Sequence, residues 1–220
     1  MTSGFISNFK NKNGFTLAEV LITLVIIGVI AAATIPTLIN NTQKHEYVSK
    51  LKKAYSNLVQ ATNLIIAEEG PVPVWSGEKG VVHGYYKKKL VIAKECGYDE
   101  GCLEQRRYKY LNGGNSLDWE SNDTYYKLVL SDGTQLILEE FYPACNVVGG
   151  MSGEQDICMF MEVDLNGGKE PNTIGRDVFA FVLKKDGLYP VGIGRENRCT
   201  TNYNGYNCAA KVLKEGAMNY

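Results

Sequence analysis

The chain has 220 residues, of which 45% are hydrophobic and 21% are charged, and its formal net charge is −1. A near-neutral chain lacks the basic face of a general nucleic-acid-binding protein, so the composition argues against that class. If one long segment is set aside for a membrane, the remainder is enough for about one compact domain.

The first element in chain order is a hydrophobic run at residues 15–39, in which Glu19 is the one ionisable residue. About 20 apolar residues span the hydrocarbon core of a bilayer, and here they surround the helix on all sides, as lipid requires. A secretory signal peptide has a shorter apolar region of about 7–15 residues. A buried helix of a soluble protein is the other alternative. We expect a helix that crosses the cytoplasmic membrane once.

A short basic leader precedes this run. Residues 1–14 include Lys10 and Lys12 and end in Gly14. The two lysines and the amino terminus favour a cytoplasmic location for this end, although the lysines in residues 44–53 leave the orientation open on charge alone. All the cysteines follow the run, which places the C-terminal part outside, where disulfides form.

Glu19 is the most informative residue of the run. A carboxylate at membrane depth costs on the order of 2.5–3.5 kcal/mol and normally has a partner. No Lys or Arg lies within the run to provide one. Cleavage after Gly14 would create a free amine at Phe15, either on the same helix or on a neighbouring subunit. A lone glutamate whose side chain reaches the interface is the alternative.

The order Gly14-Phe15-Thr16-Leu17, then Glu19 and an apolar helix, resembles the N-terminal motif of type IV pilins and type II secretion pseudopilins. The resemblance implies that a prepilin peptidase cuts after Gly14 on the cytoplasmic face and methylates the new N-terminal Phe15. It also implies that Glu19 serves methylation and the registration of subunits in a helical filament.

Gly28 and Pro36 match the places of a glycine and a proline in the long helix of this family. Gly lowers helix propensity, and Pro removes a backbone hydrogen bond and kinks a helix. We therefore predict two points at which the helix bends or melts during packing.

Residues 40–70 are predicted to continue the same helix with an amphipathic pattern. Apolar side chains recur at three- and four-residue spacing from Tyr47 to Ile65, which predicts one helix over residues 15–68, ended by "EEGPVP". A helix of roughly 80 Å needs a partner along its second half. We expect the rest of the chain to be that partner, with a coiled coil as the alternative.

Residues 71–220 are expected to form an extracytoplasmic globular head. Strand patterns at 125–130 and 135–141 flank Asp132-Gly133 and predict a hairpin. Further strands are predicted at 157–165 and within 177–192, with a turn at Asp186-Gly187. No strand is predicted in residues 74–122, where the stretch Tyr85–Lys89 is expected to be a solvated surface rather than a contact with DNA.

The expected fold class is therefore α+β, with a long N-terminal helix whose first half is transmembrane. Its second half packs on a small antiparallel sheet of four or five strands. The resemblance implies the same pilin-like fold.

The cysteines suggest three disulfides between neighbours in sequence: Cys96–Cys102, Cys145–Cys158 and Cys199–Cys208. Six cysteines permit fifteen connectivities, so pairing by adjacency is the simplest hypothesis. Zinc is the alternative, but no C-x2-C pair occurs, and both histidines are remote from the thiols in sequence.

The segment from Asp164 to Asp177 carries hard oxygen donors in a Gly-rich loop, namely Asp164, Asn166 and Asp177. Such donors suit Ca²⁺, although the spacing is not that of an EF-hand. A turn in which Asp and Asn satisfy their own backbone is the alternative. The resemblance adds that major pseudopilins bind calcium in a loop of the C-terminal region.

No catalytic motif and no phosphate-binding loop occur, so we do not expect an enzyme. The resemblance implies the precursor of a structural subunit, of the main shaft rather than the tip, in a type IV pilus-like or type II secretion pseudopilus filament. Such a filament would be periplasmic or on the cell surface. The alternative is a single-pass membrane-anchored binding protein that does not polymerise.

The partners that the resemblance implies are other copies of this chain, minor pilins or pseudopilins, the prepilin peptidase, the inner-membrane assembly machinery and the lipid bilayer. Nucleic acid is expected as a partner only for a DNA-uptake pilus.

Overall fold

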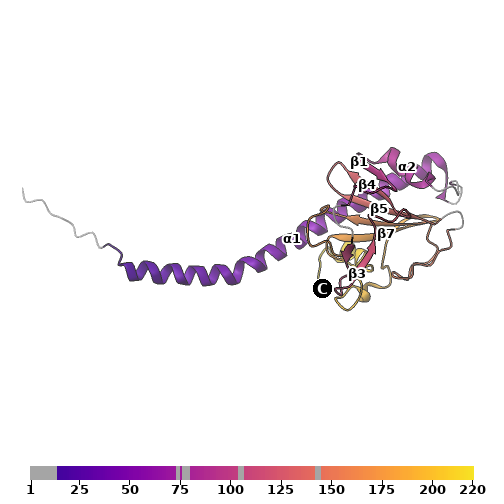
Figure 1. Ribbon diagram of the computed structural model, residues 1–220. Coiled ribbons are helices and arrows are strands. Elements are labelled where there is room, and N and C mark those ends of the chain that lie inside the picture. The colour runs from indigo at the N-terminus through magenta and orange to yellow at the C-terminus, as the bar shows by residue number, and fades with distance from the viewer. Residues whose placement is uncertain (1–13, 73–74, 76–79, 104–106, 142–144) are drawn as a thin grey trace, which may run out of the picture. The chain divides into compact units, whose positions relative to one another are not determined.

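The computed structural model describes residues 14–72, 75, 80–103, 107–141 and 145–220 (Figure 1). Residues 1–13 of the expected leader, and Pro73 of the expected helix end, lie outside this part of the chain. The chain divides into two compact units after Thr42, and each is described by itself.

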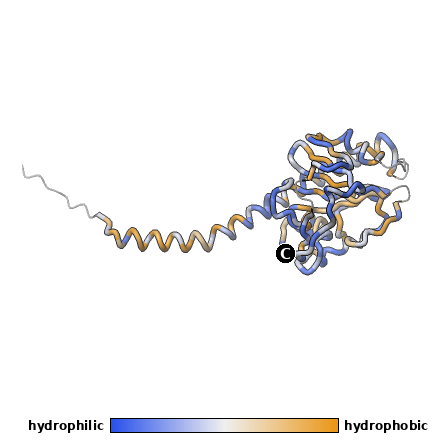
Figure 2. Tube along the Cα trace, viewed as in Figure 1, coloured by the Kyte–Doolittle hydropathy of each residue, from blue (hydrophilic) through white to orange (hydrophobic). Residues whose placement is uncertain are grey.

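Helix α1 runs without interruption from Leu17 to Glu69, which confirms the single long helix. It ends at Gly70, which has a left-handed φ of 87° and whose N–H donates to the Ile66 carbonyl oxygen at 3.0 Å. Glycine adopts this conformation without strain, and Pro71 cannot continue the helix. Figure 2 shows that hydrophobic residues dominate the first part of α1 and that polar residues become frequent further along.

The head, residues 43–220, is built on a six-stranded antiparallel sheet in the order β1-β4-β5-β6-β7-β8 (Figure 1). Its strands are β1 (Ile92–Gly97), β4 (Tyr126–Leu130), β5 (Gln135–Glu140), β6 (Met159–Asp164), β7 (Val178–Lys184) and β8 (Gly187–Pro190). A separate pair consists of β2 (Arg107–Lys109) and β3 (Asn115–Asp118). The α+β fold class and the five strands from β4 to β8 are confirmed.

The three strands in residues 74–122 were not predicted. Because β1 joins the main sheet, that sheet has six strands and not the four or five expected. Strand β1 is an edge strand, bonded only to β4, and most of its side chains are exposed or half-buried. An edge strand of this kind has no alternation of buried and exposed positions, so its sequence carries no period-2 signal.

Helix α2 (Val81–Lys89) contains the stretch that was expected to be a solvated surface. The expectation is wrong for Tyr86, which is fully buried and whose hydroxyl lies 2.6 Å from that of Thr62 on α1. Lys87 and Lys89 form ion pairs with Glu95 and Glu68. The basic side chains of this stretch therefore attach α2 to β1 and to the end of α1.

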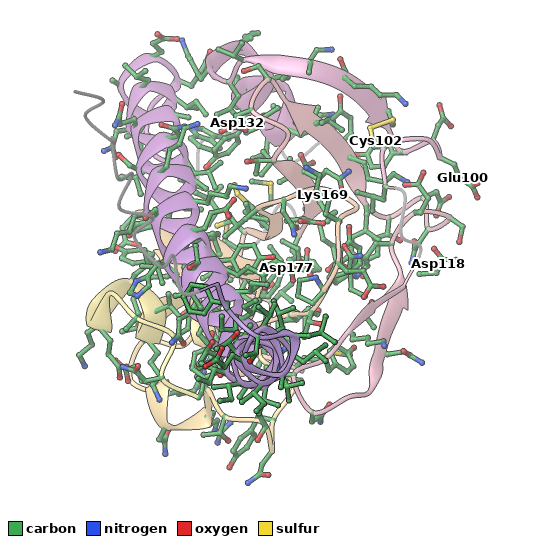
Figure 3. The ribbon with its side chains drawn as sticks, turned by 90° about the vertical axis from the view of Figure 1, so that its left-hand side faces the viewer. Glu100, Cys102, Asp118, Asp132, Lys169 and Asp177 are labelled. Atoms are coloured by element: carbon green, nitrogen blue, oxygen red, sulfur yellow. A yellow bond between two sulfur atoms is a disulfide. The ribbon has the colours of Figure 1, made fainter. Side chains whose placement is uncertain are left out.

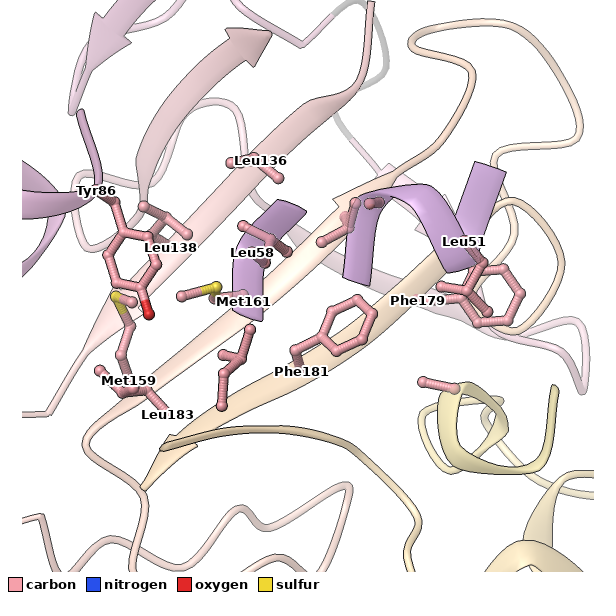
Figure 4. Packing of buried hydrophobic residues seen from close by; sticks show 14 of the residues in the cluster. Leu51, Leu58, Tyr86, Leu136, Leu138, Met159, Met161, Phe179, Phe181 and Leu183 are labelled. Atoms are coloured by element: carbon pink, nitrogen blue, oxygen red, sulfur yellow. The ribbon is translucent and has the colours of Figure 1, made fainter. Parts of the chain in front are cut away.

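One face of the sheet packs on α1. Leu58 of α1 lies beside Met161 and Leu51 lies beside Phe179, in the same core as Phe181 (Figure 4). The ring of Tyr55 stacks on that of Phe181, with centroids 5.4 Å apart. Each buried leucine contributes about 1.5–3 kcal/mol. The face of α1 that is buried in the head comprises Tyr47, Val48, Leu51, Ala54, Leu58, Ala61, Thr62 and Ile65, as the amphipathic pattern predicted.

The opposite face of the sheet is also buried. Ile137, Phe160, Ala180 and Val182 point to this side, because side chains alternate along a strand. Long connecting segments cover them and contribute aromatic side chains, among them Trp119. The head ends with the 3-10 helix η2 (Glu196–Arg198) and helix α3 (Cys208–Glu215).

Candidate functional site

The predicted cleavage site lies in non-helical backbone just before α1. Gly14, Phe15 and Thr16 precede the first helical residue, and Phe15 is 88% exposed. A Cβ atom built on Gly14 would meet nothing within 4 Å. Exposed non-helical backbone is the preferred substrate of proteases, so the Gly14–Phe15 peptide is open to an enzyme.

Thr16 and Glu19 form a capping box at the start of α1. The Thr16 N–H donates to Glu19 Oε2 at 2.8 Å, and the Glu19 N–H donates to Thr16 Oγ1 at 3.2 Å. The Thr16 hydroxyl donates to the same carboxylate oxygen at 2.9 Å. These bonds satisfy two backbone donors that a helix start leaves without partners, and they place a negative charge at the positive end of the helix dipole.

In the uncut chain the Glu19 carboxylate is therefore held by Thr16. Its pairing with a free amine of Phe15 stays a prediction for the cleaved chain. The sequence analysis did not predict the capping role of Thr16, although the spacing Thr-x-x-Glu before an apolar run is a recognised signature of a helix start.

The first part of α1 exposes its apolar side chains on all sides. The large ones are Leu17, Val20, Leu21, Ile22, Leu24, Val25, Ile26, Ile27, Val29, Ile30, Ile35, Leu38 and Ile39. Within the described part of the chain, α1 is the one helix that is long and apolar enough to cross a membrane. Such a surface is stable only against lipid or other apolar helices.

Gly28 and Pro36 both lie inside the uninterrupted helix. Pro36 has no N–H to donate to the Ala32 carbonyl, so one helical hydrogen bond is missing there. A Cβ atom at Gly28 would meet nothing within 4 Å. The absence of a side chain at Gly28 is therefore not required by packing within this chain, and bending at the two positions stays a prediction.

All three predicted disulfides are present: Cys96–Cys102, Cys145–Cys158 and Cys199–Cys208. The first fastens β1 to the segment that follows it (Figure 3), and the last fastens the start of α3. None of the six thiols is left to bind zinc. Three disulfides are typical of a domain that folds in an oxidising compartment.

Asp164 and Asp177 lie together at the base of the loop that joins β6 to β7, and both are fully buried. Asp164 accepts hydrogen bonds from the Asn166 N–H and from the Tyr108 hydroxyl, both at 3.1 Å. Burial and the negative charge of Asp177 raise the pKa of Asp164 to about 8. Two acids in one buried place stabilise each other's protonated form, or a cation between them.

Asp177 accepts hydrogen bonds from the backbone N–H groups of Asn172 at 2.8 Å and Thr173 at 2.7 Å. The loop thus satisfies part of its own backbone, as the alternative to a metal site predicted. The side-chain oxygens of Asn166 and Asn172, however, are buried and have no hydrogen-bond partner.

The site offers two carboxylates, together with two amide oxygens that have no hydrogen-bond partner, and these are donor types that Ca²⁺ prefers. The described residues contain no group of three or more His, Cys, Asp or Glu side chains placed to hold a metal. A calcium ion here would therefore rest on Asp164 and Asp177 together with Asn166 and Asn172, of which Asn172 was not predicted.

Comparison with known proteins gives one result, at the N-terminus. No curated protein and no solved structure matches the chain. Residues 9–35 match the family model described as the prokaryotic N-terminal methylation motif, and its described part contains Gly14, Phe15, the Thr16–Glu19 capping box and Gly28. The chain therefore carries the N-terminal signature of the type IV pilins and pseudopilins.

Proposed function

We propose that this chain is the precursor of a structural subunit of a type IV pilus-like or type II secretion pseudopilus filament. The observation that carries the proposal is the methylation motif at residues 9–35. The structure supports it with an exposed Gly14–Phe15 peptide directly ahead of a capped helix whose first part is apolar on all sides.

In this proposal a prepilin peptidase removes residues 1–14 on the cytoplasmic side and methylates the amine of Phe15. The cleaved end then carries a positive charge one helical turn from Glu19. In a bundle of apolar helices an unpaired carboxylate is costly, so Glu19 and a Phe15 amine pair within or between subunits. Because only certain axial offsets allow every pair to form, this pairing sets the register of the filament.

The proposed location is the cytoplasmic membrane, crossed once, with the head outside and later in a periplasmic or surface filament. The three disulfides support an oxidising location for the head. Van der Waals packing of apolar helices then supports the assembly of the subunits once they leave the lipid. The proposed partners are further copies of the chain, minor pilins or pseudopilins and the inner-membrane assembly machinery.

The test is intact-mass and N-terminal mass spectrometry of the protein purified from its own membranes. A chain that begins with N-methyl-Phe15 is the expected result. A chain that still begins at Met1 would overturn the proposal and favour a membrane-anchored binding protein that does not polymerise.

A further inference from the structure

The head contains a cavity of about 260 Å³ on the loop-covered face of the sheet. Six aromatic side chains line it. Five of them, Tyr110, Trp119, Tyr125, Phe160 and Tyr206, lie near one another, and the sixth is Phe141. Ring centroids lie 6.1 Å apart for Tyr110 and Tyr206, 5.7 Å apart for Phe160 and Tyr206, and 6.5 Å apart for Trp119 and Tyr125. Each of these five rings thus packs against another ring of the wall.

Two carboxylates from neighbouring strands line the same cavity, Glu139 of β5 and Glu162 of β6. They lie on one face of the sheet because Glu139 pairs with Phe160 and Ile137 pairs with Glu162. Glu162 is only 3% exposed, and its Oε2 atom has no hydrogen-bond partner. None of the described residues that line the cavity is Lys, Arg or His.

A buried carboxylate oxygen without a partner is destabilising. Other buried carboxylates of the described head accept hydrogen bonds from backbone N–H groups, as those of Asp177 and Glu140 do. One carboxylate oxygen of Glu162 thus lacks a partner within the described part of the chain, although Tyr206 and the backbone act on the carboxylate as hydrogen-bond donors. A bound cation would supply a partner for this oxygen.

We propose that this pocket binds an alkylammonium cation, such as the trimethylammonium group of choline or the side chain of a lysine. Aromatic ring faces attract such cations, and this attraction grows when the cation leaves water. The two carboxylates add charge complementarity, and the apolar wall accommodates the alkyl groups. An anion would be repelled by the same acids, and a neutral ligand would leave their charges without a counter-ion.

The pH dependence of binding follows from the groups that face the pocket. Burial raises the pKa of both Glu139 and Glu162, and the negative charge of Glu139 raises the pKa of Glu162 further. The tyrosines at 110, 125 and 206, whose pKa values burial also raises, stay neutral. A bound cation favours the ionised acids, so binding tightens as the pH rises above 4.5, the ordinary pKa of a glutamate, and releases protons.

The experiment is calorimetric titration of the full chain in detergent micelles with four probes. Choline represents a free alkylammonium, and Nα-acetyl-lysine methylamide represents a protein lysine. The uncharged choline isostere 3,3-dimethylbutan-1-ol has the same shape without the charge, and glucose represents a neutral sugar. We expect saturable binding of one or both cations and none of the neutral probes. The tighter of the two cations identifies the source of the group.

Glu162→Gln is the decisive variant, and Glu46→Gln, on the exposed side of α1, is its matched control. We expect Glu162→Gln to weaken cation binding by about tenfold or more, and Glu46→Gln to leave it unchanged. Glu162→Gln removes an acid that burial disfavours, so its melting temperature should not fall. If it nevertheless fails to fold, the partly exposed Glu139→Gln provides the same test.

Three results would each overturn the proposal. They are no saturable binding of either cation, equal binding of the uncharged isostere or of glucose, and wild-type affinity in Glu139→Gln and Glu162→Gln. None of them depends on whether the chain is cleaved or forms a filament.

Discussion

Thr16 and Glu19 donate hydrogen bonds to each other across the first turn of α1, one from each backbone N–H. The helix start is therefore fixed two residues beyond the Gly14–Phe15 peptide, which leaves that peptide outside the helix. The same carboxylate has two successive partners in the proposed function, Thr16 before cleavage and an amine of Phe15 after it.

Replacing Thr16 with Val should loosen the helix start. The variant loses both hydroxyl contacts with Glu19, and loss of a helix cap costs about 1 kcal/mol. Hydrogen exchange of the full chain in micelles should show faster exchange at Ala18 and Glu19. Thr16→Ser keeps the hydroxyl and is the matched control. Equal protection in the Val and Ser variants would contradict the capping role.

Glu19→Ala or Glu19→Val should still insert into the membrane and be cleaved, yet assemble poorly or lose methylation. The apolar substitution removes a charge that insertion disfavours, but it also removes the partner of the Phe15 amine. Mass spectrometry of Phe15 and electron microscopy of the filaments are the measurements. Glu46→Ala is the control on the same helix. Normal filaments from the Glu19 variants would show that the pairing does not set the register.

Glu140→Gln should destabilise the head at neutral pH. Burial disfavours the charge of Glu140, but hydrogen bonds from the Gly80 N–H at 3.0 Å and from the His83 N–H at 2.7 Å and ring nitrogen at 2.9 Å outweigh it and lower its pKa. Hydrogen bonds to a charged group are worth about 1.5–3 kcal/mol, which is the expected loss.

The pH dependence of this effect has a definite sign. A depressed pKa of an acid adds stability above its ordinary value of 4.5, and this contribution is lost as the pH falls through the lowered value. Urea unfolding across acidic pH should therefore show the wild type and Glu140→Gln converging below 4.5. A constant difference in the free energy of unfolding between the two proteins at every pH would contradict the assignment of the effect to the carboxylate charge.

The double variant Cys145→Ser, Cys158→Ser should unfold more readily than the wild type. The two residues are 13 apart in sequence, and closing a loop of this length stabilises a protein by about 3 kcal/mol. Urea unfolding with and without a reducing agent measures this. The reducing agent should bring the urea midpoint of the wild type closer to that of the variant. Equal midpoints without the reducing agent would contradict the prediction.

Calcium should raise the melting temperature of the head, if Asp164 and Asp177 bind it together with Asn166 and Asn172. Binding at a hundredfold excess over the dissociation constant adds about 2.7 kcal/mol. Mg²⁺ is smaller and dehydrates reluctantly, so its effect should be weaker. The shift should shrink in Asn172→Ala, which removes an amide oxygen but no charge. Identical melting temperatures in calcium and in a chelator would show that this loop does not bind calcium.

The features predicted from sequence are those that short-range patterns encode. Spacing of three and four residues revealed the buried face of α1. Runs around Asp132-Gly133 and Asp186-Gly187 revealed β4, β5, β7 and β8, and the run at 157–165 revealed β6. The disulfides followed from adjacency because each closes a short loop. The motif around Gly14 and Glu19 is contiguous and needs no tertiary information.

The features that were missed depend on tertiary contacts. Strand β1 has mostly exposed or half-buried side chains and is identified only by its pairing with β4. Tyr86 is buried because α2 folds against α1. The lysines beside it in the sequence gave no indication of this burial. The pocket brings together residues from Tyr110 to Tyr206, so no local spacing could reveal it.

The packing of α1 along one face of the sheet has a mechanical consequence. Leu51, Leu58 and Ile65 lie about two helical turns apart from one another along α1, and all are buried in the same core. A load applied along the helix axis would have to break these contacts at the same time, because no one of them can separate unless the others slide with it. Tension passing along a filament through α1 would therefore be shared across the central strands, and each head would follow its helix instead of peeling from it.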